Sequence, residues 1–190
     1  MKKLAAFILL GAAMAAAQPI SLDMDPAQTQ VEFVLPSTLH TIHGTFALKH
    51  GAIQFDPATG KASGELVVDA TTGNSGGGAR DRRMNKEILQ SDRYREIAFR
   101  PDRVEGKVAV DGPSQVQLHG MFSIHGAEHE IYVPVDVAAS GGQYSATAHF
   151  AVPYVQWGMK NPSTLFLRVN DKVEITVHTV AAKRMVTAAR

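Results

Sequence analysis

The sequence predicts an all-β protein built from about eight antiparallel strands arranged as a barrel or a sandwich. Three observations support this fold class. Apolar and polar residues alternate with a period of two through most of the chain, turn-forming residues separate the alternating segments, and helical spacing is confined to one stretch. Strands of this kind have one apolar face and one solvated face, as strands of antiparallel sheets do.

The first 17 residues have the pattern of a secretory signal peptide. Lys2 and Lys3 are followed by an apolar stretch over 4–14, and three alanines over 15–17 offer a cleavage site before Gln18. The stretch is shorter than the roughly 20 residues that span a bilayer. An uncleaved membrane anchor is the alternative interpretation. We therefore expect a periplasmic or secreted protein.

The strands follow in order along the mature chain, separated by turn formers. The alternating segments lie at 31–35, 42–48, 116–124, 131–137, 144–152 and 173–177. The turn formers between them include Asp56–Gly60, Asp111–Pro113, His125–Gly126, Ser140–Gly142 and Asn170–Asp171. The sequence contains no repeat with a longer period, which argues against a solenoid or a propeller.

One segment departs from strand alternation. A flexible Gly/Ser loop over 73–78 precedes a charged stretch over about 80–90, in which Met84, Ile88 and Leu89 have helical spacing. We expect one short helix here, lying over an end or an edge of the sheet.

Length and composition limit the classes of function. The 190 residues suit a single domain, expected over 18–182, followed by a short C-terminal tail over 183–190. The chain has 19 Lys and Arg against 18 Asp and Glu, so no basic excess is available to hold nucleic acid. Without Cys there is no thiolate nucleophile, thiolate zinc site or iron–sulfur cluster. Neither of the serine-nucleophile motifs, G-x-S-x-G and S-x-x-K, lies on a suitable structural element, and the phosphate-binding loop motif is missing from the sequence.

Five segments of the chain carry recognisable motifs: Asp25–Phe33, His43–Phe46, Arg80–Phe99, His119–Gly126 and Trp157–Gly158. Taken together, these motifs make the sequence similar to the YceI-like, or polyisoprenoid-binding, family of secreted bacterial proteins. Each motif alone is weak, and their order and spacing carry the resemblance, which extends over nearly all of 22–180. The chain departs from the family pattern in lacking a Pro before Ile97 and in extending beyond Val180.

The resemblance implies a lipocalin-like barrel that binds a polyisoprenoid, quinone or similar amphiphile inside and performs no catalysis, with no cofactor other than such a ligand. The expected lining of this lipid tunnel is Phe33, Phe46, Phe99, Leu118, Phe122, Phe150 and Trp157, with Ile124, Val133 and Val135 on the same apolar faces. Because small barrels either fill with side chains or hold one ligand, a filled core is the alternative for these residues.

Three residues are candidates for the mouth of the tunnel or for contact with a lipid head group. Arg80 and Arg82 suit an anionic pyrophosphate, because a guanidinium pairs with phosphate bidentately. The alternative is a solvated helix start, in which Asp81 is favourable near the N-terminal dipole. Tyr154, close to Trp157 in a Pro- and Gly-containing loop, either lines the mouth or plugs the base of the barrel.

Two further functions stay open at this level. His125 and His129 could share a face and serve a metal-assisted hydrolase or isomerase, although exposed scattered histidines, and hence no metal site, are the simpler interpretation. The second further function is that of a structural envelope stress protein with a filled barrel and a protein partner. For the lipid-binding function we expect an amphiphilic ligand and no nucleic acid, while transient membrane contact and a homodimer stay open.

Overall fold

Antiparallel strands make up most of the chain, as the alternation predicts. The computed structural model describes residues 19–185, so the expected signal peptide over 1–17 lies outside the described residues. The described strands are β1 (Ile20–Met24), β2 (Gln30–Leu35), β3 (Ile42–Phe55), β4 (Ala62–Asn74), β5 (Glu96–Gly106), β6 (Gly112–Ile124), β7 (Ala127–Ser140), β8 (Gln143–Val152) and β9 (Val173–Met185).

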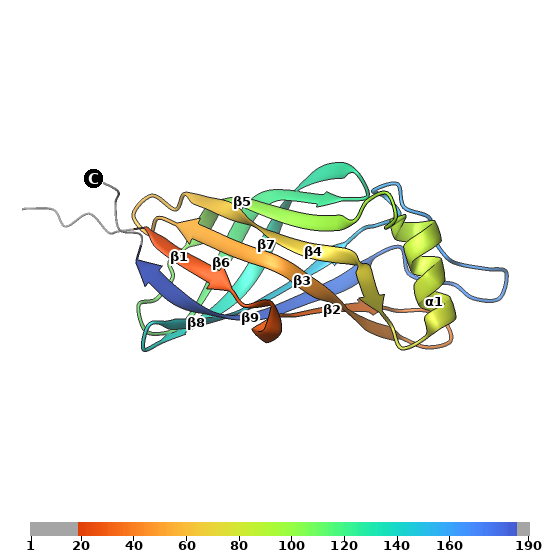
Figure 1. The fold of residues 1–190 in the computed structure, drawn as a ribbon, viewed down its shortest axis with the longest axis horizontal. Coiled ribbons are helices and arrows are strands. Elements are labelled where there is room, and N and C mark those ends of the chain that lie inside the picture. The colour runs from red at the N-terminus through yellow and green to blue at the C-terminus, as the bar shows by residue number, and fades with distance from the viewer. Residues whose placement is uncertain (1–18, 186–190) are drawn as a thin grey trace, which may run out of the picture.

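These strands form a closed barrel with eight positions (Figure 1). From β2 to β9 each strand pairs antiparallel with the next, and β9 closes the barrel by pairing with β2, where Val31 lies opposite Val177. β1 occupies the same position as β2, because it also lies between β3 and β9. The predicted antiparallel barrel of about eight strands is therefore confirmed.

A short break separates β1 from β2 in this shared position. There the 3-10 turn η1 (Pro26–Gln28) is capped by Asp25, whose side chain accepts a hydrogen bond from the Ala27 amide at 2.9 Å. The Thr29 hydroxyl donates to the Asp25 carbonyl at 2.9 Å and is hydrogen-bonded to the Thr179 hydroxyl at 2.8 Å. The second bond ties the break to β9.

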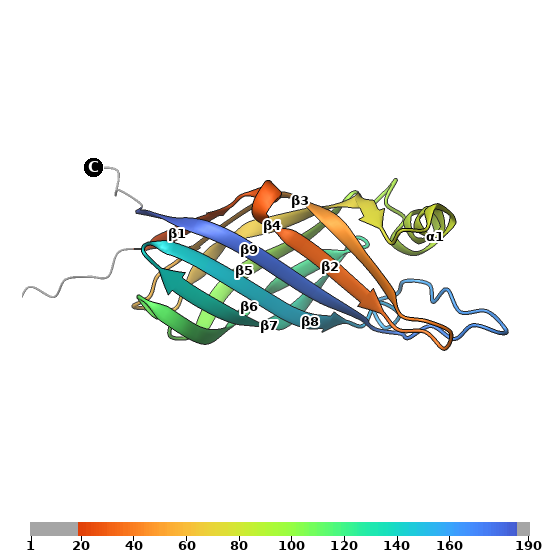
Figure 2. The same ribbon diagram turned by 90° about the horizontal axis from the view of Figure 1, so that it is seen from below.

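One helical segment covers an end of the barrel, as predicted for residues 80–90 (Figures 1 and 2). It starts as the α-helix α1 (Gly78–Arg83) and continues as a π-helical stretch, η2 (Met84–Leu89). It ends at Gln90, which adopts a left-handed conformation with φ 49°. Leu89 is buried, and Met84 and Ile88 pack against the barrel core.

The core is divided between the two ends of the barrel. At the end away from α1, it is centred on Ile20, Phe55, Val104, Val116, Val133 and Val135. At the α1 end, it is centred on Leu89, Phe122, Ile124, Val152, Tyr154 and Met159. The chain that joins β8 to β9 therefore contributes to the core beneath the helix.

The last strand runs further than the sequence suggested. β9 pairs with β1 as far as Met185, which lies opposite Ile20. The first three residues of the segment 183–190, which was expected as a tail, are therefore part of a barrel strand. The remaining residues, 186–190, lie outside the described part of the chain.

Candidate functional site

The barrel encloses a cavity of about 200 Å³ between its two core clusters. Strands from all around the barrel line it, together with η2 and the segment between β8 and β9. Almost every lining side chain is apolar, and the polar groups among them are those of Tyr154 and Thr179. Thr179 is hydrogen-bonded to Thr29, which satisfies its hydroxyl. The cavity therefore favours a hydrocarbon over a polar guest.

Most of the residues predicted to line a tunnel surround this cavity. They are Phe33, Phe46, Phe99, Leu118, Phe122 and Phe150, with Ile124, Val133 and Val135. All of them except Phe99 come from the segments in which alternation indicated an inward face. Whether they contact a ligand stays a prediction.

Sequence reasoning missed a set of flexible side chains that also line the cavity. Met24, Met84 and Met159 belong to it, with the aliphatic residues Ile88 and Leu89 of η2. The helical spacing of Met84, Ile88 and Leu89 was a usable signal, because it indicated the apolar face that the helix turns toward the barrel. Met159 had no such signal, since it lies in a segment without periodicity.

Tyr154 lies at the α1 end of the cavity and is only 5% exposed. Its hydroxyl donates a hydrogen bond to the Asn170 carbonyl at 2.7 Å, which ties together the two halves of the segment between β8 and β9. Burial raises the pKa of Tyr154 to about 12, so the phenol is neutral at physiological pH. The structure therefore places Tyr154 in the cavity lining at the end that the helix covers. Whether this end is the mouth of a tunnel stays a prediction.

Trp157 packs beside the cavity lining rather than within it. Its ring stacks on the imidazole of His129, with centroids 4.0 Å apart, and lies 5.8 Å from the ring of Phe122. His129 Nε2 is buried without a hydrogen-bond partner among the described residues, and burial lowers the pKa of His129. A neutral imidazole in an aromatic stack explains this arrangement without a metal.

His125 has a separate environment in the β6–β7 turn. Its ring packs on Tyr94, with centroids 4.8 Å apart. The two histidines considered as metal ligands thus pack on two different aromatic rings. Over residues 19–185 no cluster of three His, Asp or Glu side chains is placed to hold a metal ion.

The charged residues at the start of the helix anchor the preceding loop. Arg80 donates from Nε to the Ser75 hydroxyl at 2.7 Å and from Nη2 to the Ser75 carbonyl at 2.8 Å. The Asp81 carboxylate accepts hydrogen bonds from the Ser75 amide, at 2.9 Å, and from the Ser75 hydroxyl. These contacts give Asp81 a structural role at the start of the helix. Arg82 is exposed, and the head-group role of Arg80 and Arg82 stays a prediction.

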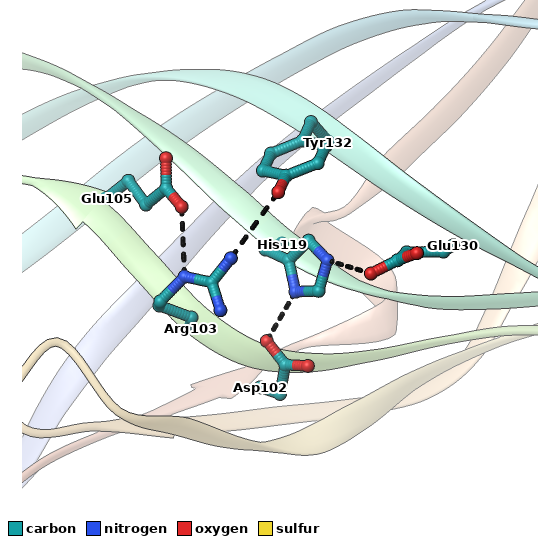
Figure 3. Close-up of polar contacts among 6 residues, drawn as sticks. All are labelled: Asp102, Arg103, Glu105, His119, Glu130 and Tyr132. Carbon is teal, nitrogen blue, oxygen red and sulfur yellow. Dashed lines mark hydrogen bonds and ion pairs between the residues drawn. The ribbon is translucent and has the colours of Figure 1, made fainter.

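A polar cluster centred on the buried His119 lies on the outer face of the barrel, away from the cavity (Figure 3). The His119 ring is held between two carboxylates, with Nδ1 2.6 Å from Asp102 Oδ1 and Nε2 2.8 Å from Glu130 Oε1. The ring of Tyr132 covers it at 4.6 Å, and His119 is 6% exposed. The hydrogen bonds to Asp102 and then Glu130 raise the pKa of His119.

The sequence held a signal for part of this cluster. His119 and Tyr132 lie directly opposite each other on β6 and β7, on the polar face of both strands. The contribution of Asp102 depends on a register irregularity in β5 between Pro101 and Arg103, which alternation does not reveal. No serine or other nucleophile bonds to His119, and the cluster fastens β5, β6 and β7 together.

A comparison with protein-family models identifies the domain that this barrel forms. The model of the YceI-like domain matches residues 22–181, which is most of the chain. The chain belongs to the YceI-like family. A search of curated proteins found no match.

Several solved structures share this fold. BcnA of Burkholderia cenocepacia is 20% identical, with a TM-score of 0.70 over 84% of this chain and 100% of its own. A domain from Saccharophagus degradans, described as a polyisoprenoid-binding domain implicated in plant cell wall breakdown, is 14% identical, with a TM-score of 0.62 over 87% of this chain and 98% of its own. The YceI protein of Campylobacter jejuni is 11% identical, with a TM-score of 0.54 over 98% and 99%.

The helices of the described residues were also compared with the requirements of a membrane span. None between residues 19 and 185 has the length and hydropathy needed to cross a bilayer.

Proposed function

We propose that this YceI-like protein binds the hydrocarbon tail of a polyisoprenoid, quinone or similar long-chain amphiphile in its barrel, and that it carries or sequesters that molecule without bond chemistry. The single observation that supports this most strongly is the nearly uninterrupted apolar lining of the cavity. The Saccharophagus degradans neighbour, described as polyisoprenoid-binding, supports the same ligand class.

The energetics of such binding depend on the length of tail that is buried. Burial contributes about 0.8 kcal/mol per CH₂-sized group, hence roughly 4 kcal/mol for each five-carbon isoprene unit. Immobilising the ligand costs roughly 4–15 kcal/mol. Burial of about one to four units therefore offsets the cost, and no charged contact to the head group is required for affinity.

The cavity volume sets a second condition. At about 200 Å³ it exceeds the roughly 150 Å³ that accommodates a benzene ring, but it is short of the space for several isoprene units. A longer tail requires side chains to move. Met24, Met84 and Met159 are suited to this, because an unbranched thioether changes rotamer at low cost. We expect the tail to enter at the α1 end, where Met84 and Met159 lie.

The proposed setting is the periplasm or the extracellular space. The signal-peptide pattern of residues 1–17 supports this location. Fusion of residues 1–17 to a reporter that is active only after export, with Lys2 and Lys3 replaced by Glu as a control, tests it.

The ligand is tested by native mass spectrometry of protein purified without detergent, followed by titration with a fluorescent polyprenyl analogue. Ala148 lines the cavity on β8, and Ala151 on the same strand is exposed. We expect Ala148→Trp to abolish binding by filling the cavity and Ala151→Trp to leave it unchanged. Protein that is always ligand-free and takes up no added analogue overturns the proposal.

Within residues 19–185, the metal-assisted alternative lacks a group of three His, Asp or Glu side chains that could hold a metal ion. The two candidate metal-binding histidines pack on separate aromatic rings, and the interior contains a cavity instead of the filled core that a purely structural barrel requires.

A further inference from the structure

Three large apolar side chains project into solvent at the α1 end of the barrel. Leu39 lies in the β2–β3 connection and is 72% exposed. Leu165 and Phe166 lie between β8 and β9 and are 90% and 87% exposed. Of the large hydrophobic residues exposed within 19–185, the others are Val110 and Tyr132, which lie elsewhere on the barrel.

Hydrogen bonds hold these side chains outward. The Thr38 amide donates to the Arg168 carbonyl at 2.9 Å and the Asn170 amide donates to the Pro36 carbonyl at 3.0 Å, so the two connections form one paired extension. The Thr164 amide donates to the Leu167 carbonyl at 2.8 Å, which closes a turn with Leu165 and Phe166 at its apex. The extension projects beyond the barrel on the side of α1 (Figures 1 and 2).

The same end of the molecule has an excess of positive charge. The connections at this end, residues 36–41, 75–95, 125–126 and 153–172, contain nine Lys and Arg and four Asp and Glu. The rest of residues 19–185 contains seven Lys and Arg and fourteen Asp and Glu. The apolar turn therefore belongs to an end of the molecule whose connections carry a net positive charge, while the rest of residues 19–185 is acidic.

We propose that this end of the protein docks on the surface of an anionic lipid bilayer, with Leu39, Leu165 and Phe166 inserted at the level of the head groups. Apolar side chains beside basic residues are the combination that interfacial binding uses, because the cations are drawn to lipid phosphates while the apolar groups leave water. The three side chains stand on the narrow paired extension, which suits insertion between lipids better than it suits the flat, extensive contact of a stable dimer.

Docking in this orientation places α1 and the Tyr154 end of the cavity against the membrane. The inference goes beyond the proposed function, because attachment to a bilayer is measurable whatever the cavity holds.

The test is flotation of the mature chain with vesicles of phosphatidylglycerol and phosphatidylethanolamine, compared with vesicles of phosphatidylcholine alone. We expect binding to the anionic vesicles that weakens at high salt. The double variant Leu165→Ser/Phe166→Ser is expected to lower the partition coefficient at least about tenfold. Val110→Ser is the matched control, since Val110 is 93% exposed in the β5–β6 connection at the opposite end, and it should bind as the unaltered protein does.

Two results overturn the inference: no flotation with anionic vesicles, or equal flotation of the double variant. Sedimentation velocity tests the competing occupant of the apolar turn, which is a second copy of this chain. If the unaltered protein is a dimer and the double variant is a monomer, the turn serves self-association. Circular dichroism checks that each variant is folded. Titration with the polyprenyl analogue in the absence of vesicles separates the two proposals, since the double variant should keep full ligand binding.

Discussion

The imidazole ring of His129 lies flat on the indole ring of Trp157, with the planes 6° apart and the centroids separated by 4.0 Å. The stack joins β7 to the segment between β8 and β9, and this segment also carries Tyr154 and the exposed turn at Leu165. Because His129 Nε2 is buried, the pKa of the ring is lowered and the ring resists protonation.

This relationship predicts a loss of stability in acid. Burial holds the pKa of His129 below its usual 6.5, so the unfolded chain takes up this proton first as the pH falls. The contribution of neutral His129 is fully present above pH 6.5 and decreases as the pH falls toward the folded-state pKa. Urea unfolding at a series of pH values should show this decrease, and His129→Phe, which keeps an aromatic ring in the stack, should reduce it. An identical pH slope in the variant contradicts the prediction.

His119 predicts the opposite dependence. Hydrogen bonds to Asp102 and Glu130 raise its pKa above 6.5, so the charged ring stabilises the fold below that pH and the contribution is lost as the pH rises through the folded-state value. NMR titration of the ring should show a lower pKa in Asp102→Asn. Glu105→Gln is the control, because Glu105 pairs with Arg103 and does not bond to His119. If the pKa of His119 is the same in Asp102→Asn as in Glu105→Gln, Asp102 does not raise it.

Gly44 should not tolerate a side chain. It lies opposite Phe33 on the neighbouring strand, and a Cβ there would be 2.3 Å from Phe33 Cζ and 2.6 Å from the Asn74 carbonyl oxygen. We expect Gly44→Ala to lower the free energy of unfolding by about 1–3 kcal/mol through overpacking. Gly78→Ala, where the nearest such contact is an ordinary 3.5 Å, should have little effect. Equal urea midpoints for the two variants would refute this.

Asp81 should control the order of the loop before the helix. Asp81→Ala removes both hydrogen bonds to Ser75, and we expect faster amide hydrogen exchange over residues 75–83 with a global loss of about 1 kcal/mol. Glu87→Gln, which weakens only the exposed pairs of Glu87 with Lys160 and Arg83, should leave exchange in this loop unchanged. Protection that is the same in Asp81→Ala as in the original protein would show that Arg80 alone holds the loop.

The sequence allowed the inward faces to be predicted where alternation is unbroken. In β6 and β7 the residues expected inside, such as Phe122 and Val133, are buried. β3 differs, because an irregularity between Leu48 and His50 moves the inward face from even-numbered to odd-numbered positions. Leu48 and Ile53 are therefore both buried, although a regular strand would place them on opposite faces.

The candidate site was predictable in its strands and less so in its connections. Phe33, Phe46, Phe122 and Phe150 follow from period-two spacing. Trp157 and Met159, in contrast, lie in a segment without a regular period. There, the contact of Trp157 with His129 and the burial of Met159 depend on a backbone path set by bonds such as that from Tyr154 to Asn170. Such long-range contacts have no signature in local sequence.

The pairing of β9 with both β1 and β2 also bears on how the chain reaches its native state. Because the first and last strands are neighbours, no fragment that stops before residue 173 can complete the ring, and β2 and β8 would each keep an open edge ready to join another molecule. The barrel can therefore close only when the chain includes β9. A prematurely terminated chain is expected to aggregate instead of persisting as a smaller domain.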